Sequence, residues 1–171
     1  MKKNILIYGL ISGIVVSILM LFSANNINDY DTSLIIGYTS MLVSFSLVFV
    51  GIRNYRDKYN EGVISFGKAF KIGILIVLIA STIYVVVWLV AYFYFEPDYF
   101  EKCTAKMLEK MRSGGASQVE LDTQVKKMEV FAGMYKNPFF NALFTYIEIL
   151  PVGLLVTLIS SFILKRKTAK N

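Results

Sequence analysis

The chain has 171 residues, 56% of them hydrophobic, and its 18 Lys and Arg against 12 Asp and Glu give a net charge of +6. This is the length of one domain, but the composition is too apolar for an ordinary soluble globule of that size. With no His and a single Cys, the chain cannot build zinc sites of Cys and His, Ser-His-Asp triads or His-ligated haem and copper centres.

Four long apolar stretches predict four membrane-spanning helices. They cover about residues 5–22, 33–52, 72–95 and 139–164, and only the last contains an ionisable group, Glu148. At 1.5 Å per residue, each stretch crosses most of a hydrocarbon core of about 30 Å. Backbone amides in lipid must be satisfied within the segment, so each stretch is expected to be a helix.

The first stretch has one alternative interpretation, a cleaved signal peptide, because Lys2 and Lys3 precede it. Its apolar part is longer than the roughly 7–15 residues of a signal peptide, and Phe22 stands where a cleavage site requires a small residue. We therefore expect the stretch to remain as a helix.

The distribution of Lys and Arg predicts the orientation in the membrane. If the chain crosses four times, one side carries +9 and the opposite side, with Asp29 and Asp31, carries −2. Cytoplasmic loops are enriched in Lys and Arg, so the basic side and both termini are expected in the cytoplasm. The eleven basic residues of that side are Lys2, Lys3, Arg53, Arg56, Lys58, Lys68, Lys71, Lys165, Arg166, Lys167 and Lys170.

Aromatic residues crowd the outer ends of the third and fourth stretches. Rings of this kind favour the level of the lipid headgroups, so the two groups predict an interfacial belt. For Trp88 and Phe144, packing between helices is an equally good interpretation. The residues concerned are Trp88, Tyr92, Phe93, Tyr94, Phe95, Phe139, Phe140, Phe144 and Tyr146.

The connection over residues 96–138 predicts an extracytoplasmic helical hairpin between the third and fourth spans. Apolar residues recur at helical spacing until Gly114-Gly115 breaks the pattern, and Ser117 with Glu120 matches the capping box that begins a helix. A second apolar stripe then runs to Asn137-Pro138. We expect the stripes to cover each other or the outer faces of the spans; the alternative is a groove for a protein partner.

Cys103 lies on the first helix of this hairpin and has no second cysteine in the chain with which to pair. A packed, inert thiol is the expected role of a cysteine on an apolar stripe. A disulfide between two copies of the chain, in a homo-oligomer, is the alternative.

Glu148 is the leading candidate for a functional residue, since ionisable groups inside membrane spans are costly and often functional. It lies 17 residues before Lys165, or roughly 25 Å from the inner boundary. The structural alternative is a carboxyl that reaches the interface or bonds to Tyr146, Asn141 or a neighbouring hydroxyl. Pro151 lacks a backbone donor and is expected to kink the helix beside Glu148.

Small residues recur every four positions in several spans, which predicts close helix packing in a compact bundle. They support a homo-oligomer only weakly. The steps are Gly9 and Gly13 in the first span, Ser40 and Ser44 in the second, and Gly153, Thr157 and Ser161 in the fourth.

The basic loop between the second and third spans contains further candidate residues: Arg53, Arg56, Asp57, Gly62 and Phe66. Its cations lie at the expected depth of the headgroups, where each contributes on the order of 1 kcal/mol against an anionic leaflet. Topology alone also explains the charge, so contact with a specific lipid or protein is a hypothesis.

Two separated segments carry a family resemblance. Tyr55-Arg56-Asp57 with Gly62 to Phe70, and then Glu148 to Leu154 with Lys165-Arg166-Lys167, resemble the bacterial membrane family catalogued as domain of unknown function 4199. The resemblance covers the whole chain as one domain, residues 1–171. It implies an inner-membrane protein of Gram-negative bacteria and brings no known activity, ligand or partner. The residues of interest in these segments are Arg56, Asp57, Gly62, Phe66, Glu148 and Pro151.

The sequence therefore predicts an all-α, multi-pass integral membrane protein that is not an enzyme and needs no cofactor or metal. Its expected role is structural or accessory, with membrane lipids or a protein partner contacted through the hairpin or the basic loop. The alternative is a small transporter, or an ion or proton pathway, built around Glu148 in an oligomer. Nucleic acid is not an expected partner, because the basic residues flank membrane spans.

Overall fold

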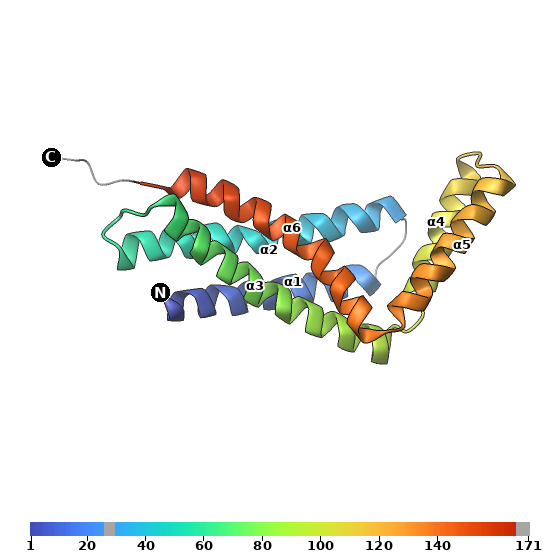
Figure 1. The fold of residues 1–171 in the computed structure, drawn as a ribbon, viewed down its shortest axis with the longest axis horizontal. Coiled ribbons are helices and arrows are strands. Elements are labelled where there is room, and N and C mark those ends of the chain that lie inside the picture. Colours follow the sequence, from blue (N-terminus) through green and yellow to red (C-terminus); the bar gives the residue numbers. More distant parts are fainter. Residues whose placement is uncertain (26–29, 167–171) are drawn as a thin grey trace.

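The computed structural model describes residues 1–25 and 30–166 (Figure 1). Asp29, Lys167 and Lys170, which contribute to the predicted charge asymmetry, lie outside the described residues. The elements are α1 (Lys2–Asn25), α2 (Tyr30–Tyr59), α3 (Phe66–Val90), the π-helical turn η1 (Ala91–Phe95), α4 (Tyr99–Ser113), α5 (Gln118–Tyr135) and α6 (Pro138–Leu164).

Four of the described helical segments are long and apolar enough to cross a membrane: Lys2–Ser23, Asp31–Tyr59, Phe66–Phe95 and Pro138–Leu164. This confirms the all-helical fold class and the four predicted apolar helices. The helices are longer than the uncharged stretches, because charged flanks such as Arg53 to Lys58 continue the helical hydrogen-bonding pattern of α2.

The four long helices form a bundle in which α1 and α6 occupy opposite corners. Each of these two packs against both α2 and α3. Helix α1 therefore lies beside α3, and the two run in the same direction, since Gly9 faces Ile79 and Gly13 faces Ile83. A Cβ added at Gly9 would lie 2.8 Å from Ile79, which confirms that the small residues allow close helix packing.

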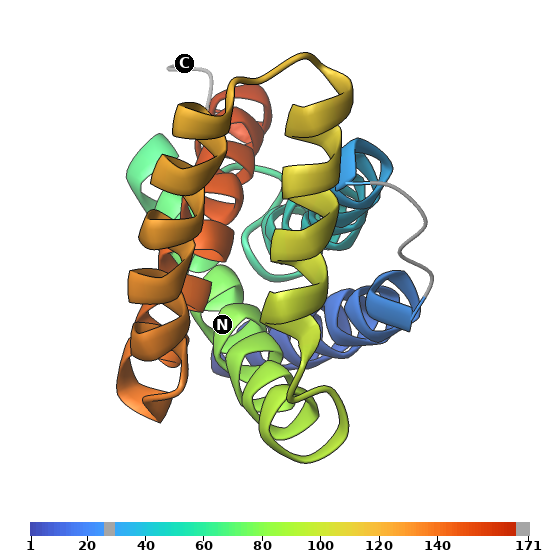
Figure 2. The same ribbon diagram turned by 90° about the vertical axis from the view of Figure 1, so that its right-hand side faces the viewer.

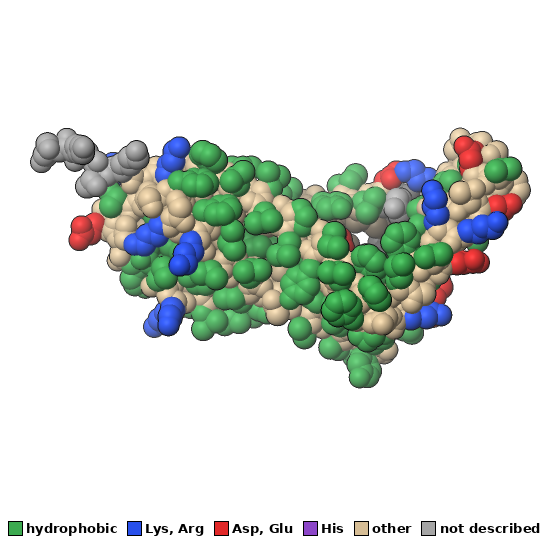
Figure 3. Space-filling view, in the orientation of Figure 1, with side chains coloured by type: hydrophobic (Ala, Val, Ile, Leu, Met, Phe, Trp, Pro, Cys, Tyr) green, Lys and Arg blue, Asp and Glu red, His purple; other side chains and the backbone are tan. Residues whose placement is uncertain are grey.

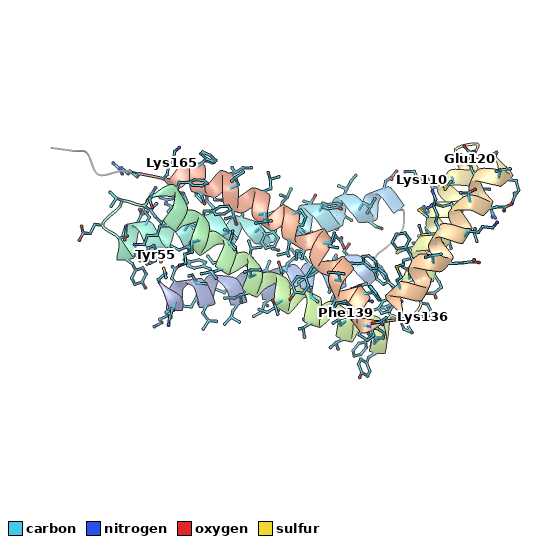
Figure 4. The ribbon with its side chains drawn as sticks, in the orientation of Figure 1. Tyr55, Lys110, Glu120, Lys136, Phe139 and Lys165 are labelled. Atoms are coloured by element: carbon cyan, nitrogen blue, oxygen red, sulfur yellow. The ribbon has the colours of Figure 1, made fainter. Side chains whose placement is uncertain are left out.

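The surface of the bundle is apolar around its middle. Figure 3 shows hydrophobic side chains over the centre of one face, mostly Lys and Arg among the charged side chains at one end, and charges of both signs on α4 and α5 at the other. Exposed large hydrophobic side chains occur on all four long helices, which is the pattern of helices that face lipid. We call the end with Arg56, Lys68 and Lys165 the basic end; Figure 4 places Tyr55 and Lys165 there.

Helices α4 and α5 lie side by side and cross the opposite end of the bundle (Figures 1 and 2). Ser117 caps α5: its side chain accepts from the Glu120 backbone, and Glu120 accepts from the Ser117 backbone, as the predicted capping box requires. Asn137 caps α6, with Pro138 in the first turn. Lys136 and Phe139 mark the attachment of the pair to the bundle, whereas Glu120 lies at its far end (Figure 4).

Candidate functional site

A cavity of about 160 Å³ lies where the α4–α5 pair crosses the bundle. Its lining comes from every long helix and from both members of the pair. Figure 3 shows the surface hollowed between the bundle and the pair. The end of the molecule with this hollow is called the cavity end below.

Glu148 of α6 is the acidic residue that lines this cavity. Its side chain is exposed because it faces the hollow, and the other lining residues surround it. Among the described residues, no hydrogen bond or ion pair to the carboxylate is formed. The partners considered from the sequence are engaged elsewhere, since the Tyr146 hydroxyl lies 2.9 Å from Thr82 Oγ1 and Asn141 Oδ1 accepts from Trp88 Nε1 at 3.1 Å.

Aromatic rings form much of the wall around the carboxylate. Trp88 and Tyr84 come from α3, Tyr99 from α4, Tyr135 from α5 and Tyr38 from α2. The Trp88 and Tyr99 rings meet edge to face, with centroids 4.9 Å apart. This contact between α3 and α4 holds the pair against the bundle.

The aromatic residues near the ends of α3 and α6 divide into two groups. Trp88 and Tyr92 are buried, at 7% and 4% exposure, and belong to the packing around the cavity. Tyr94, Phe95 and Phe139 are 79%, 75% and 70% exposed, as an interfacial belt requires. Trp88 therefore packs between helices, which was the alternative to a place in the belt. Phe144 does the same, since its ring stacks on Tyr135 with centroids 5.8 Å apart.

The tyrosines of the pair are held neutral beside the carboxylate. Burial raises the pKa of Tyr135 to about 12, and the nearby charge of Glu148 adds to the rise. Burial is also the main cause that raises the pKa of Tyr99, with the Cys103 side chain and Glu148 as further causes. Both phenols are therefore uncharged at neutral pH, and both rings lie within the field of Glu148.

Two further residues of α4 line the cavity, Cys103 and Lys106. The Cys103 thiol is half-buried and lines the cavity together with Tyr99. Burial raises its pKa, so the thiol is protonated at neutral pH. This placement favours the packed thiol over a disulfide between copies. Lys106 brings a cation to the lining that also contains Glu148.

The candidate residues of the basic loop lie at the opposite end of the bundle and fasten that loop. Arg56 donates from Nη1 to the Leu164 carbonyl at 3.3 Å and pairs through Nε with Asp57 at 2.7 Å. The Gly62 amide donates to the Arg56 carbonyl at 2.9 Å, and its φ of +76° suits glycine. Arg53 is exposed and lies 3.6 Å from Asp57.

A second set of contacts joins the same loop to the end of α6. Ile64 and Arg166 exchange backbone hydrogen bonds of 2.9 and 2.8 Å. The ring of Phe66 packs on Phe162 with centroids 4.7 Å apart. These residues hold together the α2–α3 loop and the last turn of α6.

Pro151 lies within α6, which continues as one helix from Pro138 to Leu164. Its side chain is exposed and is not part of the described cavity lining. The structure therefore places Glu148 in the cavity lining and the other predicted candidates at the basic end or on the exposed face of α6.

The aromatic wall was missed as a site from the sequence. Tyr84, Tyr99 and Tyr135 belong to three different helices, and only the fold brings them to Glu148. One signal was present, the concentration of aromatic residues at the depth of the single intramembrane carboxylate. In the described part of the chain, no three His, Cys, Asp or Glu side chains gather as metal ligands would.

A family model described as "Protein of unknown function (DUF4199)" matches residues 6–166. No curated protein and no solved structure matches the chain.

Proposed function

The chain belongs to the DUF4199 family of proteins of unknown function, and from the geometry of its cavity we propose that it is a non-enzymatic, multi-pass membrane protein that binds a small organic cation at Glu148. The observation that carries this proposal is a carboxylate without a described partner, facing a cavity walled by aromatic rings.

A cation in the cavity would contact both the Glu148 carboxylate and the aromatic rings. The carboxylate supplies a full negative charge, and the faces of Trp and Tyr rings attract a cation by about 0.5–2 kcal/mol each, depending on desolvation. Sites for quaternary ammonium and methylated amines use such rings. The neutral phenols of Tyr99 and Tyr135 are suited to this role, because they add no charge of their own.

The size of the cavity limits the ligand. One water needs about 10–15 Å³ of such space, and the cavity offers about 160 Å³. There is thus room for on the order of ten non-hydrogen atoms. A compact amine fits this volume better than a drug-sized ligand, whose pockets are typically about 300–1,000 Å³.

The helices pack closely between the cavity and the basic end. This packing favours binding of the cation over its passage through the bundle. Gly153 lies five residues after Glu148, and a Cβ placed there would clash with Val77 and lie 3.2 Å from Phe45 Cζ. Phe45 and Val77 are 0% and 1% exposed. A transporter or a proton pathway would have to open this contact, so it is the second candidate and not the first.

Binding is also favoured over catalysis. Glu148 is the acidic residue of the described lining, and Cys103 is protonated beside Tyr99 at neutral pH. General acid–base and nucleophilic mechanisms need a second group tuned to exchange a proton or activate a nucleophile. A single carboxylate of this kind is suited to binding a cation.

The proposed setting is the inner membrane, with the basic end in the cytoplasm and the α4–α5 pair as an extracytoplasmic hairpin. The charge asymmetry of the sequence supports this orientation. The exposed apolar faces make membrane lipids the main proposed partners. The cavity would then accept its ligand from the outer side.

The test is calorimetric titration of the purified full-length protein in a non-ionic detergent with tetramethylammonium and ethanolamine. We expect saturable binding that Glu148→Gln weakens by about tenfold or more, because interactions with a charged group contribute about 1.5–3 kcal/mol. Glu129→Gln is the matched control: it removes an exposed carboxylate of α5 that does not belong to the described lining.

Thermal unfolding of each variant establishes that it is folded before titration. The proposal fails if neither probe binds to the native protein, or if Glu148→Gln binds both as well as Glu129→Gln does. Cation flux in proteoliposomes that disappears in Glu148→Ala would move the assignment to the transporter.

A further inference from the structure

We infer that the cation is a primary ammonium, and that Tyr84 selects it by accepting one of its N–H hydrogen bonds beside Glu148. A carboxylate and aromatic rings alone can hold either a methylated nitrogen or one that carries hydrogens. This inference rests on the proposed function, since it names the chemical class of the ligand that Glu148 holds.

Tyr84 of α3 presents a buried hydroxyl without a partner to the cavity. The side chain lines the cavity and is 7% exposed. Among the described residues, its hydroxyl forms no hydrogen bond. The fully enclosed, unpaired side-chain atoms of that part of the chain belong to Asn4, Ser81 and Thr157, so the Tyr84 oxygen is reached from the cavity. A buried hydroxyl that lacks a hydrogen bond is costly, and a ligand that bonds to it removes that cost.

Tyr84 and Glu148 lie close in depth, and their side chains lean toward each other. Helices α3 and α6 run in opposite directions (Figure 1), and the Tyr146 hydroxyl donates to Thr82 Oγ1 at 2.9 Å. Tyr84 is two residues farther along α3 and Glu148 two residues farther along α6, so their backbones lie about one helical turn apart in depth. Side chains lean toward the N-terminus of their own helix. Because the helices are antiparallel, Tyr84 leans toward the level of Glu148, and Glu148 toward that of Tyr84.

The other two lining side chains of α3 and α6, Trp88 and Thr145, use their hydrogens within the bundle. Trp88 Nε1 donates to Asn141 Oδ1 at 3.1 Å. Thr145 Oγ1 donates to the Asn141 carbonyl at 2.8 Å. A phenol can accept from an N–H group and donate to a carboxylate, so the Tyr84 hydroxyl can bond to an ammonium and to Glu148 at the same time.

These acceptors favour an ammonium that carries hydrogens. Its N–H donors are strongly hydrated in water, and burying them without new hydrogen bonds is costly. Glu148 and Tyr84 supply acceptors from two facing helices. A quaternary nitrogen has no N–H, so it would leave the Tyr84 hydroxyl unpaired. The rings of Tyr99 and Tyr135 can contact either kind of cation, so they do not decide between the two.

The experiment compares propylammonium with propyltrimethylammonium, which carry the same charge and differ only in the methyl groups that replace the N–H hydrogens. Both are smaller than the roughly ten non-hydrogen atoms for which the cavity has room. Each is titrated calorimetrically into the full-length protein in a non-ionic detergent. We expect the native protein to bind propylammonium about tenfold more tightly, because hydrogen bonds to charged groups are among the strongest in proteins.

Tyr84→Phe identifies the residue that selects the ammonium. It keeps the ring and removes the hydroxyl, so it should lower the affinity for propylammonium about tenfold and leave that for propyltrimethylammonium unchanged. Glu148→Gln should instead weaken both probes, because both carry the charge. Tyr94→Phe is the matched control: it removes the hydroxyl of a tyrosine that is 79% exposed and outside the described lining, and it should change neither affinity.

Thermal unfolding of each variant establishes that it is folded before titration. If Tyr84→Phe does not fold, propylammonium with one or two N-methyl groups provides a second measurement in the native protein. The affinity should fall as methyl groups replace the N–H donors. An affinity that rises with methylation would overturn the inference.

The outcomes separate this inference from the proposed function. If the native protein binds propyltrimethylammonium at least as tightly as propylammonium, the primary ammonium is wrong and the cation site stands. If Tyr84→Phe weakens both probes equally, or neither, Tyr84 does not select the ligand. If neither probe binds to the native protein, the proposed function fails together with this inference.

Discussion

Gly153 shows how a single small residue separates the cavity from the rest of the bundle. It stands where α6 comes closest to α3, with Val77 directly opposite and Phe45 beside it. Lipid offers no hydrophobic drive between helices, so close packing of this kind supplies much of their association. The four-residue spacing of Gly153 and Thr157 predicted a close contact with another helix. It did not predict that this helix would be α3.

Gly153→Ala should destabilise the bundle. The added methyl group clashes with Val77, a β-branched side chain on a helix that has little freedom to move aside. Overpacking of a filled core costs about 1–3 kcal/mol, and we expect thermal unfolding in detergent to show a loss of that size. Gly133→Ala is the control, since nothing lies within 4 Å of its added Cβ; its helix should be unchanged or slightly more stable. Equal melting temperatures for the two variants would contradict the close contact.

Asn141 marks the limit of prediction at the scale of single residues. It was considered as a partner of Glu148 because both lie on the fourth span. In the fold it accepts from Trp88 and donates to the Tyr135 carbonyl at 3.2 Å, so it connects α6 to α3 and to α5. Sequence spacing identifies neighbours on one helix, but bonds across helices depend on the rotation of each helix, which spacing leaves open.

Among the elements, α5 was the easiest to predict because its start is encoded locally. The Ser117 and Glu120 pair needs only four consecutive residues, and the structure has both of its hydrogen bonds. The aromatic run from Trp88 to Phe95 was harder. Residues four apart share a helix face, which places Trp88 and Tyr92 inward, but the π-helical turn over Ala91–Phe95 alters the rotation of the residues that follow.

Ser117→Ala should weaken α5 by about 1 kcal/mol at neutral pH, as the loss of an N-cap does. The effect should depend on pH. Hydrogen bonds from the Ser117 backbone and from the Ser117 hydroxyl lower the pKa of Glu120 below its ordinary value of 4.5, and the substitution removes the hydroxyl bond. The stability that this carboxylate contributes is therefore present above pH 4.5 and is lost as the pH falls through its lowered pKa.

Fluorescence of Trp88, the single tryptophan of the chain, provides the measurement because its ring contacts Tyr99 of the pair. The difference in melting temperature between the native protein and Ser117→Ala should be smaller at pH 3 than at pH 7. Ser113→Ala, which removes a hydroxyl bonded to the Lys110 carbonyl and no cap of α5, serves as the control. A difference that is constant with pH would show that the bond from the Ser117 hydroxyl does not stabilise the ionised form of Glu120.

At the scale of the whole molecule, the sequence predicted the number of long helices but not their order. Helices that are apolar on all sides give no strong indication of which face turns inward. The parallel contact of α1 with α3, and the diagonal placement of α1 and α6, follow from side-chain packing between distant segments. The aromatic wall depends on that order, which is why the site could be predicted only as far as Glu148.

The charge asymmetry leads to a prediction for the orientation of the whole chain. The basic loop is fastened to the end of α6 by Arg56 and Ile64, so the loop and the last turn of α6 must lie on the same side of the membrane. If that side is cytoplasmic, a cysteine at Tyr59 is protected in intact cells, and a cysteine at Val119 is open to reagents outside the inner membrane. The two side chains are 58% and 76% exposed.

Both substitutions are made in a Cys103→Ser background, which removes the native thiol. An impermeant maleimide applied to spheroplasts should label Val119→Cys at once and Tyr59→Cys only after permeabilisation. The opposite order would place the basic end outside, against the positive-inside rule, and would direct the cavity to the cytoplasm. A ligand from the outer side would then be excluded, because the close packing around Gly153 separates the cavity from the basic end. The orientation of the chain thus determines from which side of the membrane a ligand can reach Glu148.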